Sequence, residues 1–270
     1  MEIIDFHVHP FRRRENCLNI YPEMENLDAN AMRSQLMNVG ITGICGSVLS
    51  KAPLAPGFDD LRRLNREALA LAEELGGYYT PGFHIHPAWA RESCEEVEFM
   101  HRRGVRLIGE LVPYMHGWGQ FDAKNWHQIL DVAGDYSMLC CYHTPFDFDM
   151  TAMLEAHPNV TFIAAHPGDR EAQERHIHAM KRHDNLHLDL SGTGLFRFGM
   201  LRHLVNSVGD ERILFGTDYP ICNPRMYVQA VLGEPISDEA KEKILHSNAN
   251  RLFNACSGRR AAANSCSAGL

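Results

Sequence analysis

Short runs of apolar residues alternate with longer segments of helical periodicity along most of the chain. Eight apolar runs are predicted to be strands: residues 1–8, 40–49, 78–85, 105–111, 137–143, 160–166, 186–190 and 212–218. The segments between and after them are predicted to be helices: 31–39, 59–75, 92–103, 125–133, 150–156, 170–182, 200–208, 226–232 and 238–253. The pattern is clearest in 59–75, where one apolar stripe at helical spacing contains Leu61, Leu64, Ala68, Leu71 and Leu75.

This alternation predicts an α/β protein with a parallel sheet. Eight units in a chain of 270 residues predict a closed (β/α)₈ TIM barrel as a single domain. A doubly wound open sheet is the alternative, but no Gly-x-Gly-x-x-Gly motif follows the first predicted strand. We expect the barrel to occupy residues 1–255. Residues 256–270 are rich in Ala, Ser, Gly and Asn, have little to bury and are predicted to be a disordered tail.

The composition argues against several classes of protein. A formal net charge of -8 disfavours a nucleic-acid-binding surface, which is normally basic. No run of about 18 apolar residues occurs, and the first residues lack the features of a secretory signal. The eight cysteines are scattered without the spacing of a disulfide framework. We therefore expect a cytoplasmic protein with a small-molecule substrate and no nucleic-acid or membrane partner, with a homodimer as one option.

Two histidines lie close together at the end of the first predicted strand. Side chains alternate between the faces of a strand, so His7 and His9 project to the same side, and Pro10 follows them. Two imidazoles on one face can bind a metal ion. The alternative is a hydrogen-bonded pair of histidines at a strand end, and the pair alone does not decide between them.

Four more ionisable residues fall at the carboxyl ends of the fourth, fifth, sixth and eighth predicted strands: Glu110, His143, His166 and Asp218. In a (β/α)₈ barrel these ends meet at one face, which carries the active site. Burying so many ionisable groups together is costly unless a partner compensates them. A bound cation removes that cost, so the six residues together predict a metal site.

The same residues resemble the motifs of the amidohydrolase superfamily, specifically the amidohydrolase-2 group of metal-dependent TIM-barrel hydrolases and decarboxylases. The matching elements are His7-Val-His-Pro10, His143 in Cys-Tyr-His-Thr, His166 in Ala-Ala-His-Pro-Gly, Gly216-Thr-Asp-Tyr-Pro220 and Ser247-Asn-Ala-Asn-Arg-Leu-Phe253. The resemblance implies that His7, His9 and Asp218 are metal ligands and that His143 is a further ligand. It also implies that His166 either binds a second ion or acts as a catalytic acid/base.

Glu110 departs from the single-metal decarboxylases of this group. It occupies the fourth-strand position at which binuclear relatives, such as the TatD-like nucleases, place a bridging carboxylate. Two arrangements therefore remain open, a single ion or two ions. In the two-ion arrangement, one ion lies on His7, His9, Glu110 and Asp218 and the other on Glu110, His143 and His166. Mixed imidazole and carboxylate ligands suit Zn²⁺, with Mn²⁺ or Fe²⁺ as alternatives.

The leading functional hypothesis is a metal-dependent hydrolase of a small amide, ester or lactone. Zinc lowers the pKa of its bound water towards about 7, and Asp218 can act as the general acid/base, with His166 polarising the carbonyl if it is not a ligand. The alternative is a metal-dependent lyase, a decarboxylase or hydratase, of a carboxylated small molecule. A TatD-like nuclease is disfavoured by the acidic balance, and a non-catalytic metal-binding barrel is a further option.

The loops after the strands are expected to determine specificity. Candidate residues there are Phe11 to Arg14, His84, His86, Tyr114, His116, Trp118, Arg170 and Tyr219. Arg170 could bind a substrate carboxylate or could simply be a solvated residue that opens a helix. Outside the site, His176, His178 and His183 are predicted to be solvent-exposed, Asp147 and Asp149 to cap a helix, and Asn248 and Asn250 to anchor the last helix.

Overall fold

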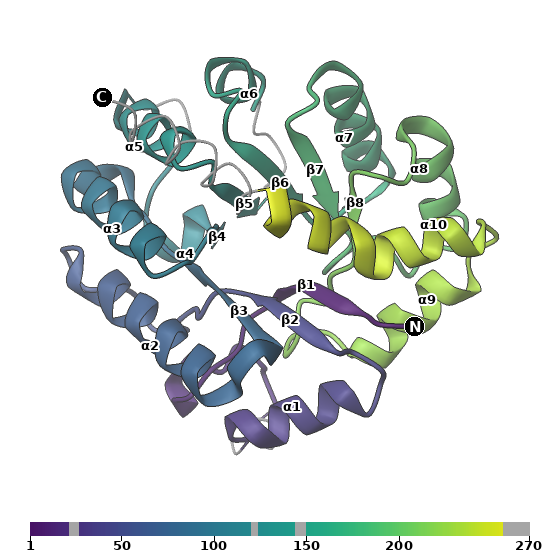
Figure 1. Cartoon of the computed structure of the whole chain (residues 1–270), viewed down its shortest axis with the longest axis horizontal. Helices are drawn as coiled ribbons and strands as arrows, with labels where there is room; N and C mark the ends of the chain where they lie inside the picture. The colour runs from purple at the N-terminus through teal and green to yellow at the C-terminus, as the bar shows by residue number, and fades with distance from the viewer. Residues whose placement is uncertain (22–26, 120–123, 144–149, 256–270) are drawn as a thin grey trace, which may run out of the picture.

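A ring of eight parallel strands forms the centre of the computed structural model, which describes residues 1–21, 27–119, 124–143 and 150–255 (Figure 1). The strands are β1 (Ile4–Val8), β2 (Gly43–Gly46), β3 (Tyr79–Phe83), β4 (Leu107–Leu111), β5 (Leu139–His143), β6 (Thr161–Ala165), β7 (Leu186–Asp189) and β8 (Ile213–Leu214). Each strand pairs with the next one along the chain. This arrangement confirms the predicted (β/α)₈ barrel.

The ring closes between the first strand and the segment that follows β8. The Phe6 amide donates to the carbonyl oxygen of Phe215 over 2.8 Å, and Val8 forms a parallel bridge with Tyr219. The predicted eighth strand, 212–218, is wrong in its length, since only Ile213 and Leu214 are regular strand. The chain bends beyond them, and Asp218 adopts a positive φ of 65°. That bend carries the candidate ligand out of the sheet.

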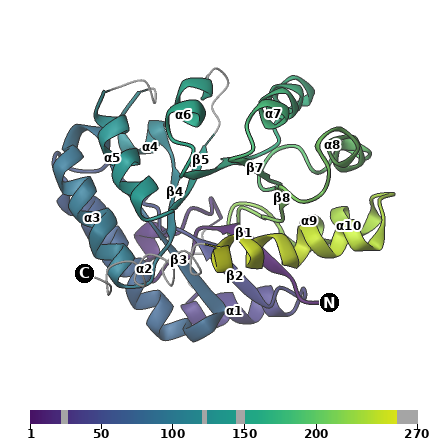
Figure 2. The ribbon, with the colours of Figure 1, turned by 45° about the horizontal axis from the view of Figure 1, so that its top comes forward.

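Helices surround the ring (Figures 1 and 2). They are α1 (Ala29–Met37), α2 (Asp59–Leu75), α3 (Ala90–Arg102), α4 (Pro113–His116), α5 (Lys124–Asp135), α6 (Thr151–Ala156), α7 (Arg170–Arg182), α8 (Met200–Val208), α9 (Pro224–Gly233) and α10 (Asp238–Glu242). Short 3₁₀ turns cover Arg14–Asn16, Gly76–Tyr78 and Pro87–Trp89. The Asp28 and Asp169 side chains cap α1 and α7 by accepting from backbone amides, as is typical of a helix start.

The predicted last helix, 238–253, is interrupted. A π-helical turn at Lys243–Ser247 separates α10 from a further helical stretch over residues 248–255. Asn248 anchors this stretch, because its amide donates to the carbonyl oxygens of Asp210 and Ile213. The stretch runs across one face of the ring (Figure 1) and places Phe253 against Phe6, with ring centroids 5.7 Å apart. It therefore covers the end of the barrel opposite the strand carboxyl ends.

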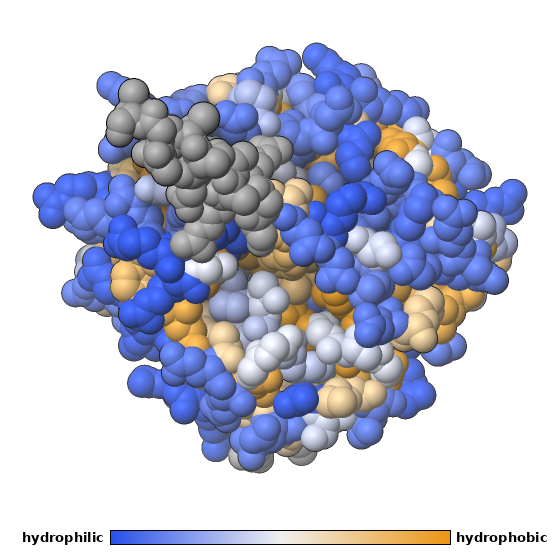
Figure 3. Space-filling model, in the orientation of Figure 1, coloured by the Kyte–Doolittle hydropathy of each residue, from blue (hydrophilic) through white to orange (hydrophobic). Residues whose placement is uncertain are grey.

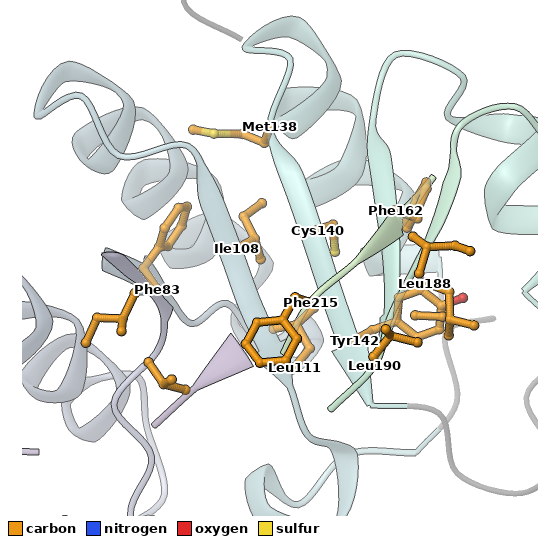
Figure 4. Close-up of a cluster of buried hydrophobic side chains, with 14 of the residues drawn as sticks. Phe83, Ile108, Leu111, Met138, Cys140, Tyr142, Phe162, Leu188, Leu190 and Phe215 are labelled. Carbon is orange, nitrogen blue, oxygen red and sulfur yellow. The ribbon is translucent and has the colours of Figure 1, made fainter. Parts of the chain in front are cut away.

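Apolar side chains fill both faces of the strands, as expected for a parallel sheet covered on both sides. The inside of the barrel holds a small cluster that includes Phe6, Leu107, Cys141, Ile163 and Leu214. A larger cluster packs between the sheet and the helices and includes Phe83, Ile108 and Phe162 (Figure 4). One core therefore packs on each side of the sheet, and together they hold the strands and their carboxyl ends in place.

The outer surface is mainly polar. Hydrophilic side chains cover most of the periphery in Figure 3, with hydrophobic residues between them nearer the middle of this face. None of the helices in the described part of the chain combines the length and the apolar character that are needed to cross a lipid bilayer.

Candidate metal centre

The structure brings all six predicted site residues together at the carboxyl ends of the strands. His7 lies on β1, with His9 just beyond it, Glu110 lies on β4 and His143 ends β5. His166 and Asp218 follow β6 and β8. The Glu110 side chain lies at the centre of the group, and its two carboxylate oxygens face different partners.

The first half of the site surrounds Oε2 of Glu110. The Nε2 atoms of His7 and His9 each lie 3.3 Å from this oxygen and 3.2 Å from one another. Oδ1 of Asp218 lies 3.3 Å from Nε2 of His9 and 3.8 Å from Nε2 of His7. Two imidazole nitrogens and two carboxylate oxygens therefore converge on one small volume.

The second half of the site surrounds the other oxygen of Glu110. Oε1 lies 2.9 Å from Nδ1 of His143 and 3.3 Å from Nε2 of His166. Glu110 itself is almost completely buried, whereas the His143 side chain is 22% exposed. The second half is thus nearer to solvent than the first, and Glu110 joins the two.

The hydrogen bonds on the far sides of the rings determine which nitrogens face inwards. Nδ1 of His9 lies 3.1 Å from the Ser47 carbonyl oxygen and Nδ1 of His7 lies 2.8 Å from Oδ2 of Asp189. Both partners only accept, so both Nδ1 atoms carry hydrogen and the Nε2 lone pairs of the neutral rings point at one another. A proton or a cation must lie between them. The donor set and its orientation therefore fit a divalent metal ion.

The charges of the site shift several pKa values. Burial raises the pKa of Glu110, but the positive charge of His7 and hydrogen bonds from His143 and His166 outweigh it and hold the pKa well below its ordinary value. Burial lowers the pKa of His9, but hydrogen bonds to Asp218 and Glu110 raise it to about 9. The pKa of His7 is likewise raised, by Asp189 and Glu110 against burial. These shifts favour charged imidazoles beside a charged carboxylate when no metal is bound.

Asp5 links the first and last segments of the barrel beneath the site. Its carboxylate accepts from the backbone amides of His7 and Thr217 and from the Thr217 hydroxyl, over 3.2, 2.9 and 2.5 Å. Burial raises the pKa of Asp5 to about 7 against these hydrogen bonds. Gly216 allows the segment before Asp218 to lie close to β1, because a Cβ at that position would lie 2.8 Å from Cβ of His7. The close approach to His7 therefore accounts for Gly216, and the hydrogen bonds to Asp5 account for Thr217.

Asp189 and Ser191 were not identified from the sequence. Asp189 ends β7 and is fully buried between His7 and Ser191, and Oγ of Ser191 lies 3.0 Å from Nδ1 of His166. Burial raises the pKa of Asp189, but the positive charge of His7 holds it below its ordinary value. The strand-end criterion that selected Glu110 and Asp218 selects Asp189 too when it is applied to the seventh predicted strand.

Three predicted specificity residues form a separate group beside the centre. His84 follows β3, His86 caps the next turn and His116 ends α4. Nε2 of His84 donates to the Val48 carbonyl oxygen over 2.7 Å, and the His84 and His116 rings are 4.7 Å apart. Burial lowers the pKa of His84 to about 4, and it also lowers the pKa values of His86 and His116. These imidazoles are therefore neutral at pH 7.

The other predicted specificity residues are divided between the site and the packing around it. Tyr114 is 70% exposed, and its ring lies 5.3 Å from that of His143 at the mouth of the centre. Trp118 packs on Trp126, with ring centroids 4.7 Å apart, and the Tyr219 hydroxyl donates to Gln35. The last two are structural contacts.

The predicted basic residues lie away from the centre. Arg12 and Arg13 pair with Glu74 and Glu67, over 3.1 and 3.7 Å. Phe11 is buried in the core. Arg170 is exposed in the first turn of α7 and lines a separate surface cavity of about 330 Å³. None of these arginines forms an ion pair with the six site residues within the described ranges.

Two predictions about remote histidines are wrong. His176 and His183 are buried, whereas His178 is exposed as expected. His176 lies on the inner face of α7 among Gln173, Ile177 and Met180, and burial lowers its pKa to about 4. The polar composition of α7 concealed that inner face. Asp147 and Asp149, predicted to cap a helix, lie outside the described residues, as does the predicted tail 256–270.

The comparisons with known proteins agree with this architecture. The family model described as Amidohydrolase matches residues 4–255. Among curated proteins, none matches the chain. An uncharacterised TIM-barrel protein from Bordetella bronchiseptica superposes with a TM-score of 0.74 at 22% identity, covering 95% of this chain and 100% of that one.

Two decarboxylases of known structure share the same fold. 2,6-Dihydroxybenzoate decarboxylase from Rhizobium has a TM-score of 0.73 at 15% identity, covering 94% of this chain and 98% of its own. 5-Carboxyvanillate decarboxylase from Novosphingobium aromaticivorans, crystallised with manganese and 4-hydroxy-3-methoxy-5-nitrobenzoic acid, has a TM-score of 0.68 at 14% identity, covering 93% and 96%. At these identities the likeness establishes the fold.

Proposed function

Given that the chain belongs to the amidohydrolase family, we propose that it is a metal-dependent lyase that decarboxylates a small carboxylated molecule. The observation that carries metal dependence is the convergence of four imidazoles on the two oxygens of Glu110. Decarboxylation is favoured over the expected hydrolysis because two decarboxylases of carboxylated aromatic acids share the fold over nearly the whole chain. The substrate class that we propose is therefore a hydroxylated aromatic acid.

The residues that would hold the ion are His7, His9 and Asp218, with Glu110 completing the set. A bound divalent ion, manganese or zinc, supplies positive charge that orients the substrate oxygens and accepts electron density during the reaction. His7 and His9 are almost completely buried, so a substrate beside the ion would meet little water on their side. Asp218 lies at the end of the bend that follows β8, and its carboxylate faces the same volume as the His9 imidazole.

His166 is the proposed proton donor. Its Nδ1 is held by Ser191, so Nε2 faces the centre. Burial lowers the pKa of His166, but the hydrogen bond with Glu110 and its charge outweigh burial and raise it. In the reaction the bond between the substrate carbon and its carboxylate breaks, carbon dioxide leaves and the electron pair stays on the carbon. That carbon takes a proton from Nε2 of His166, which regains one from solvent.

The test uses the full chain, stripped of metal and reloaded separately with Mn²⁺ and Zn²⁺. We expect carbon dioxide release from a hydroxybenzoate such as 2,6-dihydroxybenzoate, dependent on added metal. His166→Gln is expected to bind metal and still lose turnover. Turnover that is equal in the stripped and reloaded protein contradicts the proposal.

Hydrolysis stays as a second candidate because of one specific observation. Glu110 presents one oxygen to His7 and His9 and the other to His143 and His166, an arrangement suited to two ions. Paired ions favour hydrolytic chemistry, with Asp218 as the general acid/base. Metal analysis that gives two ions per chain, together with cleavage of an amide, ester or lactone without carbon dioxide release, would favour this candidate.

A further inference from the structure

We propose that Asp189 is a positioning residue that orients the imidazoles of both halves of the metal centre at once, directly for His7 and through Ser191 for His166. This inference rests on the metal site of the proposed function. Asp189 ends β7, which supplies none of the six predicted site residues. Both Asp189 and Ser191 are completely buried.

The first contact is direct. Oδ2 of Asp189 lies 2.8 Å from Nδ1 of His7 and, as a carboxylate oxygen, can only accept the hydrogen. The hydrogen of a neutral His7 therefore stays on Nδ1, and its Nε2 lone pair faces Oε2 of Glu110, 3.3 Å away. A carboxylate behind a metal-binding histidine selects its tautomer and raises its basicity in this way.

The second contact passes through a hydroxyl group. Oδ1 of Asp189 accepts from both the backbone amide and the hydroxyl of Ser191. Because its hydrogen is used on Asp189, Oγ of Ser191 accepts from Nδ1 of His166 over 3.0 Å. Nε2 of His166 is thereby directed at Oε1 of Glu110, 3.3 Å away.

The backbone next to Ser191 reinforces the same orientation. Gly192 has a φ of +59°, and a Cβ at that position would lie 2.4 Å from Nδ1 of His166. The imidazole therefore lies flat against a backbone that has no side chain. The Nδ1 atoms of His7 and His166 are held by Asp189, directly and through Ser191, and their Nε2 atoms face Glu110. Neither ring can turn without breaking a buried hydrogen bond.

The principal test is Asp189→Asn in the full chain. An amide of the same shape presents either an N–H group or a weaker acceptor to Nδ1 of His7. We expect the affinity for Zn²⁺, measured by chelator competition, to fall about 10- to 100-fold, as is typical when the partner behind a metal-binding histidine is lost. The absorption spectrum of the Co²⁺-loaded protein is expected to change as well.

Asp131→Asn is the matched control. Oδ1 of Asp131 lies 3.2 Å from Nδ1 of the buried His157, so this variant also alters an Asp–His hydrogen bond, but away from the centre. It is expected to leave Zn²⁺ affinity and the Co²⁺ spectrum unchanged. Ser191→Ala removes the contact to His166 and the hydroxyl hydrogen bond to Asp189, but it keeps the direct contact between Asp189 and His7. We expect its ¹⁵N NMR spectrum to show a changed His166 tautomer while the His7 signals stay as in the wild type.

The outcomes separate this inference from the proposed function. If the wild type binds no Zn²⁺, the metal-dependent function fails. If the wild type binds Zn²⁺ and Asp189→Asn binds it equally with an unchanged Co²⁺ spectrum, Asp189 does not position the ligands and the inference alone is overturned. Should Asp189→Asn fail to fold, the His166 signals of Ser191→Ala decide, and an unchanged tautomer there also overturns it.

Discussion

Two groups of histidines lie side by side at the same end of this barrel and behave in opposite ways. The pKa values of His7 and His9 are raised, because carboxylates outweigh the effect of burial. The pKa values of His84 and His116 are lowered by burial. At His84, burial outweighs the hydrogen bond to Val48, and at His116 the neighbouring imidazoles of His84 and His86 add to its effect. In the described part of the chain, the second group has no hydrogen bond to a carboxylate. Both groups are buried to a similar degree.

The residue type and the burial are the same in both groups, so the partners of each imidazole decide whether its pKa is raised or lowered. His7 and His9 face Glu110 and Asp218, an arrangement that suits a bound cation. His84 donates to the Val48 carbonyl oxygen and stays neutral, so its other ring nitrogen can only accept a hydrogen bond. The predictions that follow test this contrast.

The largest effect is expected from Glu110→Gln, which removes the charge shared by both halves of the centre. Metal-dependent turnover should fall about 10³-fold or more, which corresponds to about 4 kcal/mol of lost transition-state stabilisation. Steady-state kinetics and metal analysis of the same preparation measure it. Glu96→Gln alters another buried carboxylate, paired with Arg66, and should keep its metal. Full metal content and turnover in Glu110→Gln would show that the carboxylate is not central.

The pH dependence of the metal-free protein should be the next largest effect. Because the pKa of His9 rises from 6.5 to about 9 on folding, its stabilising contribution is complete below pH 6.5. It is lost as the pH rises to about 9, and amounts to about 3 kcal/mol. His84 has the opposite sign, since its pKa falls to about 4 and its contribution is lost as the pH falls from 6.5 to 4.

Chemical denaturation across pH 4 to about 9.5 measures both limbs. His9→Asn should flatten the alkaline limb and His84→Asn the acid limb. If His9→Asn leaves the alkaline limb as steep as in the wild type, His9 is not the group that holds the proton.

Metal affinity should separate the same two variants. His9→Asn removes a proposed ligand, and we expect Zn²⁺ affinity to fall on the order of 100-fold, at least as much as the loss of an outer partner. His84→Asn should leave it unchanged. Equal losses in the two variants would mean that the contrast between the groups has no bearing on metal binding.

The smallest effect is expected in the neutral group itself. Asn65 accepts from the His84 amide and donates to its carbonyl oxygen, over 2.7 and 3.0 Å. Asn65→Ala should lower the free energy of unfolding by about 1–3 kcal/mol, because it leaves buried backbone groups unsatisfied. Its metal content should match the wild type. A loss of metal without a loss of stability would show that the two groups are coupled.

The strand-end criterion selected six residues that do lie together, because it depends on general barrel geometry. Once β1, β4, β5, β6 and β8 are located, their carboxyl ends must meet. Asp189 also stands at a strand end, but it was not identified as the partner of His7, because a hydrogen bond between distant segments leaves no spacing signal in the sequence. The contact of Ser191 with His166 leaves no such signal either. The exposure predicted for His176 was wrong for a related reason, since α7 has a polar composition and its inner face is defined only by what packs against it.

The sequence by itself determined the (β/α)₈ architecture, because hydrophobic periodicity and the alternation of strands and helices are local properties of the chain. It also determined which ionisable groups stand at the strand ends. Only the tertiary structure decided which of their pKa values are raised and which are lowered. Side-chain partners such as Asp189 for His7 and Val48 for His84 come from distant segments, and the pKa of a buried imidazole depends on those partners.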